Sequence, residues 1–130
     1  MRIGELAERA GISTKAIRYY EQVGILAEPA RTPSGYRDYD QAAVGRLAFV
    51  RAGQAVGLRL GELRRIIALR DHGEVPCEHV AALLRQRSAD LDARISELQQ
   101  LRHELGRLSE QAQRLDPAHC APERVCHLIG

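Results

Sequence analysis

The chain has few aromatic residues, and it lacks the segments that direct export or membrane insertion. Its 130 residues include no Trp and one Phe, so aromatic residues make up only 4%. Met1 and Arg2 lead directly into an amphipathic segment, and no apolar run approaches the length of a membrane span. These absences predict a cytoplasmic chain with no membrane partner. It would form one small domain with an extension, or share part of its core with a partner.

Cysteine is also scarce, and its three copies are unevenly placed. Cys77 stands alone, whereas Cys120 and Cys126 lie close together near the end of the sequence. Thiols in a chain without an export signal are expected to be reduced, and an odd number argues against a framework built only of disulfides. Reduced thiolates are available as metal ligands.

The chain has almost no net charge overall, but its charged side chains are unevenly distributed. The net charge is +2, yet residues 1–70 hold 12 basic and 7 acidic side chains, against 7 and 10 in residues 71–130. A basic first half is typical of nucleic-acid-binding modules, although many domains without such a partner have the same balance.

The most regular pattern is a heptad-like run between residues 84 and 115. From Leu91 onward its apolar residues lie three or four positions apart, which predicts a helix, and two steps of three in succession predict local overwinding. No proline interrupts the run, and Gly106 is its only glycine. The central apolar residues, candidates for a dimer interface, are Leu91, Ile95, Leu98, Leu101, Leu105 and Leu108.

A long polar helix with one narrow leucine stripe needs one partner helix, and the chain has no second helix of matching length. We expect residues 80–115 to pair with the same helix of a second copy; folding back on its own domain is the alternative. A continuous helix here would be roughly 54 Å long. Cys77 therefore could not meet Cys120 or Cys126 of its own chain, but an antiparallel homodimer would bring thiols of both chains together at each end.

Two short helices are predicted at the start of the chain. Residues 2–10 place apolar side chains on one face, Gly11 ends that segment, and Ser13 is a suitable N-cap for a helix over residues 14–22. This is the helix-turn-helix pattern, whose second helix can enter a major groove; an ordinary helical hairpin with a basic face is the alternative. The candidate DNA-contacting residues on the second helix are Thr14, Lys15, Arg18 and Tyr19.

An irregular stretch over residues 27–40 follows, and two more helices come after it. Residues 35–39 alternate around a turn as a small β-hairpin would, and a basic hairpin directly after a helix-turn-helix is a wing. Asp40 is the expected N-cap of a helix to about Ala55, and residues 60–70 form the next helix. Guanidinium and phenol groups suited to phosphate contacts lie on the wing at Arg31, Tyr36, Arg37 and Tyr39.

Three segments, RIGELAERAGISTKAIRYYEQVGIL, RTPSGYRDYD and GLRLGELRRII, followed by the long helix, resemble the MerR family of transcriptional regulators. The resemblance covers essentially the whole chain, and IRYYE followed by GIL is its most specific string. It implies a homodimer that binds a pseudo-palindromic operator in the overlong spacer of a promoter, where RNA polymerase also binds. In this family the apo-protein represses, and the effector-bound protein activates by distorting the DNA.

The resemblance implies an all-α fold with a small β wing. A winged helix-turn-helix DNA-binding domain would cover residues 1–75, an antiparallel coiled-coil dimerisation helix residues 76–116, and a metal-binding loop and tail residues 117–130. Arg59 departs from the family pattern, which commonly has a serine-like N-cap there, and the loss of such a cap costs about 1 kcal/mol.

The cysteines resemble those of the metal-sensing branch of the family. Cys77 at the start of the dimer helix is typical of sensors for divalent ions, and Cys120 and Cys126 match the metal-binding loop, with a spacing somewhat short for the family. Three thiolates suit Hg²⁺, Zn²⁺, Cd²⁺ or Pb²⁺, and zinc favours a fourth ligand. The candidate fourth ligand is His119, with His127 and His79 as weaker candidates.

Other functions are less well supported by the residues. No Ser/His/Asp arrangement, glycine-rich phosphate loop or cluster of paired carboxylates indicates an enzyme. An organic-ligand sensor would need a larger domain after the long helix, where only about 15 residues follow. A redox sensor of the same fold is the main alternative, because oxidation could join Cys120 to Cys126 within one chain without Cys77.

Overall fold

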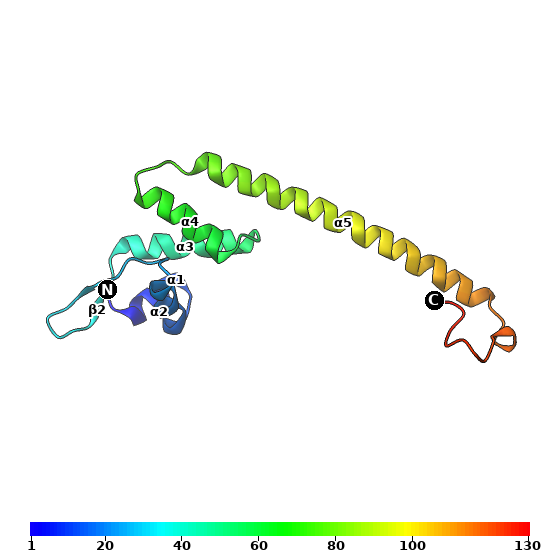
Figure 1. Cartoon of the computed structure of the whole chain (residues 1–130). Helices are drawn as coiled ribbons and strands as arrows, with labels where there is room; N and C mark the ends of the chain where they lie inside the picture. The colour runs from blue at the N-terminus through cyan, green and yellow to red at the C-terminus, as the bar shows by residue number, and fades with distance from the viewer. The chain divides into compact units, whose positions relative to one another are not determined.

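The computed structural model describes all 130 residues, which form five α-helices, one short 3₁₀ helix and a two-stranded sheet. They divide into two compact units, the N-terminal domain (Met1–Leu84) and the C-terminal segment (Arg85–Gly130). None of the helices combines the length and apolar character needed to cross a membrane. The predicted all-α fold with a small β wing is confirmed (Figure 1).

Helices α1 (Ile3–Ala10) and α2 (Thr14–Gln22) form the predicted helix-turn-helix. Gly11 follows α1 with φ of 68°, a left-handed conformation that ends helices and that glycine adopts without steric cost. The Ser13 hydroxyl oxygen accepts a hydrogen bond from the Ala16 N–H at 3.1 Å, as expected of an N-cap. Local turn and cap signals therefore define both helices.

The wing consists of β1 (Ala30–Arg31) and β2 (Arg37–Asp38), which pair antiparallel with Arg31 opposite Arg37. At its tip, the Thr32 N–H donates to the Tyr36 carbonyl at 2.8 Å, and the Tyr36 N–H donates to the Thr32 hydroxyl at 3.1 Å. The hairpin is thus wider than the predicted residues 35–39, because its first strand lies before Pro33.

Helices α3 (Gln41–Ala55) and α4 (Leu60–Asp71) begin at the expected positions. The Asp40 carboxylate accepts a backbone N–H from the first turn of α3 at 3.2 Å. Arg59 gives α4 no side-chain cap, in agreement with its departure from the family pattern. The Glu62 carboxylate instead accepts a hydrogen bond from the Arg59 N–H at 2.9 Å, which is the second half of a capping box.

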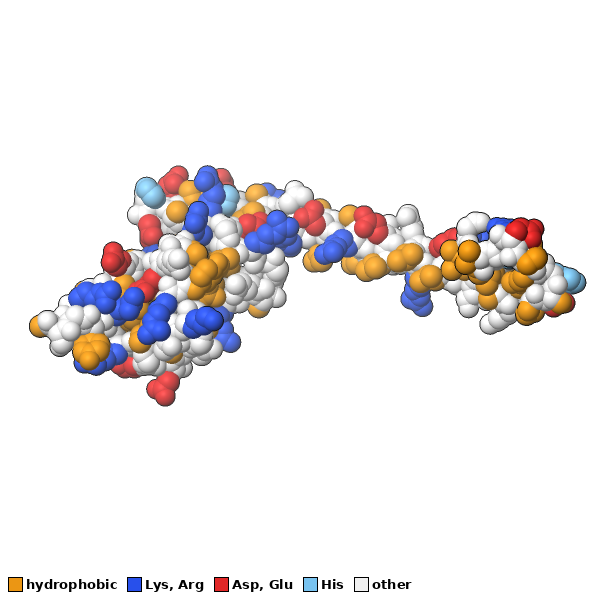
Figure 2. Space-filling model, turned by 60° about the horizontal axis from the view of Figure 1, so that its bottom comes forward, with side chains coloured by type: hydrophobic (Ala, Val, Ile, Leu, Met, Phe, Trp, Pro, Cys, Tyr) orange, Lys and Arg blue, Asp and Glu red, His pale blue; other side chains and the backbone are white.

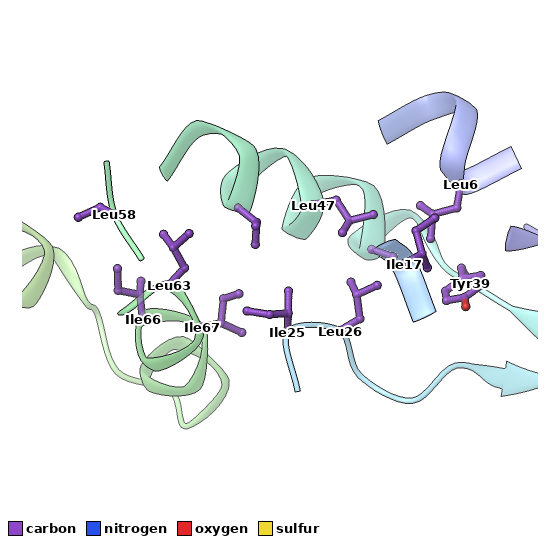
Figure 3. Close-up of a cluster of buried hydrophobic side chains, with 12 residues drawn as sticks. Leu6, Ile17, Ile25, Leu26, Tyr39, Leu47, Leu58, Leu63, Ile66 and Ile67 are labelled. Carbon is purple, nitrogen blue, oxygen red and sulfur yellow. The ribbon is translucent and has the colours of Figure 1, made fainter. Parts of the chain in front are cut away.

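One hydrophobic core holds the N-terminal domain together and fixes α2 beside the wing (Figure 3). Gly53 of α3 allows α4 to approach closely, since a Cβ atom there would lie 2.3 Å from a Leu63 methyl carbon. Val80 and Leu83, from the next helix along the chain, also pack against this core. Its fully buried side chains are those of Leu6, Ile17, Ile25, Leu47, Val50 and Leu63.

Helix α5 (Cys77–Arg114) has 38 residues, which corresponds to roughly 57 Å of continuous helix. Cys77 is the first residue of α5, so the helix begins before the expected residue 80, because the Pro76 carbonyl already accepts the Val80 N–H at 2.9 Å. No residue of α5 is buried. Figure 2 shows a row of hydrophobic side chains along it. Five residues of this row are each between 52% and 64% exposed, and they are Leu91, Ile95, Leu98, Leu101 and Leu105.

Candidate DNA interface and thiol sites

Helix α2 presents its basic side to solvent because its apolar side is buried in the core. Ile17 is completely buried, whereas Lys15, Arg18 and Tyr19 are exposed and Thr14 is half-buried. These four residues were predicted to contact DNA, and their arrangement suits insertion of the exposed side into a groove. Lys and Arg side chains also gather over the N-terminal domain on the face shown in Figure 2.

Four arginines line one surface hollow between the start of α1, helix α2 and the wing. Three of them were predicted from the sequence, and the fourth is Arg2. The Arg2 guanidinium lies over the Tyr36 ring, 4.2 Å from its centroid, in a cation–π contact. Sequence reasoning missed Arg2 because no local signal shows that residue 2 lies beside residue 36. The arginines of this hollow are Arg2, Arg18, Arg31 and Arg37.

Glu21 connects α2 to the wing. One carboxylate oxygen accepts a hydrogen bond from Arg37 Nε at 3.1 Å, and the other accepts one from the Tyr39 hydroxyl at 2.9 Å. Burial, followed by the hydrogen bond to Glu21, raises the pKa of Tyr39 to about 12. The phenol therefore stays protonated and donates to the carboxylate at ordinary pH. Sequence reasoning did not single out Glu21 either.

The position of Tyr39 does not fit the direct DNA contact expected from the sequence. Tyr39 is only 4% exposed and belongs to the core. Arg37 and Tyr39 are two residues apart, so both side chains point to the same side of the strand, toward Glu21. Tyr36, by contrast, is 55% exposed. Tyr39 thus supports the wing from inside, and Tyr36 remains on the surface.

The residues after α5 form a short loop around one thiol. A 3₁₀ turn (Pro117–His119) precedes Cys120, which is exposed. Backbone hydrogen bonds from Leu128 and Ile129 lower the pKa of Cys126, which favours its thiolate form. The thiolate is the form that binds metal ions.

The histidines near this loop differ in their availability as ligands. The His127 Nε2 atom accepts a hydrogen bond from the Ala121 N–H at 2.6 Å, so that nitrogen is already occupied. The His119 side chain is 81% exposed, and its Nδ1 atom lies 3.8 Å from an Asp116 carboxylate oxygen. His119 is therefore the freer of the two.

The chain on its own does not assemble a three-ligand metal site. All three cysteines are free thiols, and nowhere do three His, Cys, Asp or Glu side chains come together as a metal site would require. Cys77 is the first residue of α5, while Cys120 and Cys126 follow the end of that helix.

Comparison with known families agrees with the winged helix-turn-helix geometry. The sequence model of the MerR HTH family of regulatory proteins matches residues 1–70, and a second model described as MerR, DNA binding, matches residues 44–108. The chain belongs to the MerR family. It is a DNA-binding transcriptional regulator of the helix-turn-helix type.

Similar proteins cover most of the chain. The mercuric resistance operon regulatory protein of Bacillus cereus is 36% identical over 110 residues, which are 85% of this chain and 83% of that protein. The transcription regulator PbrR691 from Ralstonia metallidurans, solved with lead(II), has 36% identity and a TM-score of 0.76, with 92% and 94% of the two chains covered. A MerR regulator from Bacillus megaterium, solved with mercury(II), has 28% identity and a TM-score of 0.63, with 98% and 92% covered.

Proposed function

We propose that this MerR-family protein is a metal-responsive switch at a promoter. As apo-protein it represses, and on binding a thiophilic divalent ion (Hg²⁺, Zn²⁺, Cd²⁺ or Pb²⁺) it activates transcription by distorting the DNA. The observation that carries the proposal is the pair of free thiols, Cys120 and Cys126, that follows the end of α5, where backbone N–H groups favour the thiolate form of Cys126. The similar proteins include a mercuric resistance regulator and two regulators solved with lead(II) and mercury(II), which supports the same class of effector.

The metal ligands would come from two chains. Cys77 of one protomer and Cys120 and Cys126 of the other would supply three thiolates at each end of an antiparallel dimer. These residues fit a soft or borderline divalent ion, since sulfur ligands select such ions over Mg²⁺ and Ca²⁺. His119 would be the fourth ligand for zinc, because it is exposed and adjacent to Cys120.

The dimer would form through α5. Its exposed hydrophobic row requires a cover, and a second copy of the same helix supplies an identical row of matching length. Leu98 and Leu101 lie near the middle of the row, so an antiparallel two-fold axis would pass close to them. Leu108, half-buried in the single chain, would continue the same interface.

Both α2 and the wing, which line the hollow that holds the four arginines, would contact DNA. Arg18 and its neighbours on α2, which are Thr14, Lys15 and Tyr19, would read base edges in the major groove. Arg31, Tyr36 and Arg37 would contact phosphates from the wing. Two copies related by a two-fold axis would require a pseudo-palindromic operator, at which RNA polymerase also binds.

The experiment that tests this function is a metal titration of the reduced protein, followed by ligand-to-metal charge-transfer absorbance. Two tight ions per dimer are expected, together with activation in a transcription assay with purified RNA polymerase. Arg18→Ala should reduce discrimination between the operator and random DNA, since Arg18 is assigned to base reading. A protein that binds operator DNA but takes up no thiophilic ion would refute the metal response.

A redox switch of the same fold is the second candidate. Cys120 and Cys126 are free thiols in one loop, and the lowered pKa of Cys126 also favours oxidation. The variant Cys77→Ser separates the two functions. It should abolish a three-thiolate metal response but leave a disulfide between Cys120 and Cys126 able to form. Full response of this variant to an oxidant and none to metal would favour the redox switch.

A further inference from the structure

A carboxylate lies within the basic surface to which DNA binding is assigned. Glu21 lines a surface hollow together with Arg18, Arg31 and Arg37. Its side chain is only 12% exposed. Because DNA carries a dense negative charge, an acidic group at this position repels the ligand unless the group has another role. The contacts of Glu21 indicate what that role is.

Both oxygens of Glu21 are used, and each bonds to a residue of the wing. Arg37 Nε and the Tyr39 hydroxyl are 16 and 18 residues away in the sequence, so the contacts are long-range. Arg37 donates to Glu21 through its Nε atom alone. Its two terminal NH₂ groups are therefore left for a phosphate. Glu21 thus orients Arg37 without using up its donor groups.

The wing needs such an anchor because it is very small. Its strands have two residues each, and an isolated two-stranded hairpin is at best marginally stable in water. Tyr39 follows β2 and packs its ring into the core, at the same end of the cluster as Leu6 and Ile17 (Figure 3). The bond from its hydroxyl to Glu21 then ties the end of β2 to helix α2.

We propose that Glu21 is a positioning residue for DNA recognition. It fastens the wing to the recognition helix, so that the groove contacts of α2 and the phosphate contacts of the wing are presented in one fixed geometry. This inference rests on the proposed DNA-contacting roles of α2 and the wing. The benefit is preorganisation, since contacts that are already ordered lose less conformational entropy on binding.

The test compares Glu21→Gln with a matched control, Glu28→Gln. Glu28 is exposed and lines the same hollow, so both variants remove one negative charge from this surface. Affinities are measured for a duplex that the wild-type dimer selects from a randomised pool, and for a scrambled duplex. Glu21→Gln should weaken binding of the selected duplex about tenfold, which is the scale of one charge-assisted hydrogen bond. Its affinity for the scrambled duplex should be unchanged or higher. Glu28→Gln should weaken neither.

A double-mutant cycle shows whether Glu21 acts through Arg37. The pair Glu21→Gln/Arg37→Gln should bind the selected duplex no more weakly than Arg37→Gln alone, because a glutamine oxygen can still accept the Tyr39 hydroxyl bond. Tyr39→Phe keeps the ring in the core and removes only the hydroxyl, so it should lose affinity severalfold while retaining the wild-type circular dichroism spectrum. If Glu21→Gln fails to fold, Tyr39→Phe provides the test of the positioning role instead.

The outcomes separate this inference from the proposed function. If Glu21→Gln binds the selected duplex as tightly as Glu28→Gln does, Glu21 is only an unfavourable charge and the positioning role is wrong. Full additivity in the cycle would also overturn it. If the wild-type dimer selects no sequence from the pool, the assignment of DNA recognition to this surface fails first.

Discussion

The N-terminal domain and the C-terminal segment place their hydrophobic side chains in opposite environments. In the domain, Leu6, Ile17 and Leu63 are fully buried, whereas Leu98 and Leu101 of the segment are 64% and 56% exposed. Both units use the same residue types at helical spacing. They differ in whether the chain supplies a second surface to cover the apolar face. The domain completes its core by itself, and the proposed dimer would supply the second surface for the segment.

The strongest test of this contrast disrupts the exposed row of α5. Leu98→Glu/Leu101→Glu should yield monomers and abolish operator binding, because four charges would be placed at the centre of the dimer interface. Sedimentation equilibrium measures the change. Gln99→Glu/Gln100→Glu adds the same charges on other sides of the helix and should remain dimeric. A Leu98→Glu/Leu101→Glu protein that still sediments as a dimer would show that the row is not the interface.

The second test asks whether the thiols need two chains as well. Cys77→Ser protomers are mixed with Cys120→Ser/Cys126→Ser protomers, and the heterodimers are isolated. One end of each heterodimer keeps all three thiols and the other end has none, so one Cd²⁺ per dimer should bind tightly. Each mutant homodimer should bind it poorly.

Cd²⁺ or Zn²⁺ is a better probe than Hg²⁺ here, because Hg²⁺ can bind to the two loop thiols alone. Wild-type affinity of the Cys77→Ser homodimer for Cd²⁺ would place the whole site in one loop. A heterodimer without any tight site would mean that the helices do not run antiparallel.

The third test deletes a buried side chain from the core of the N-terminal domain. Leu63→Ala should lower the free energy of unfolding by about 2–5 kcal/mol, the usual cost of deleting a buried leucine side chain. Denaturant unfolding measures it, with Val56→Ala as the control, because Val56 is 59% exposed. The dimer should persist in the absence of denaturant. A loss below about 0.5 kcal/mol would mean that the domain core does not depend on this contact between α3 and α4.

The smallest expected effect concerns the surface of the N-terminal domain. Arg2→Gln should weaken DNA binding and lower the slope of log affinity against log salt by about one, since one phosphate contact would be lost. Arg9→Gln is the control, because Arg9 is already paired with Glu5 at 3.0 Å. An unchanged slope for Arg2→Gln would show that this guanidinium contacts only the Tyr36 ring.

Local sequence signals predicted the helices of this protein accurately. Ser13 and Asp40 cap their helices as expected, Gly11 ends α1, and the second helix has the predicted bounds. The hydrophobic period also predicted a continuous helix that ends within one residue of the expected position. Such features depend on residues only a few positions apart, so a sequence contains them directly.

The site depended more on contacts that a sequence does not display. The contact of Arg2 with Tyr36 and the bonds from Glu21 to the wing join residues distant in the chain. The expected role of Tyr39 changed for the same reason. Its residue type suits a phosphate contact, but packing of the ring in the core and the bond to Glu21 direct its hydroxyl inward.

The sequence by itself determined which helices form, where most of them begin and which of their faces is apolar, because backbone capping and helical periodicity act over a few residues. Only the tertiary structure decided which polar side chains reach the surface and which become internal supports. That choice depends on the long-range packing of α2 against the wing, where one carboxylate can satisfy two donors at once.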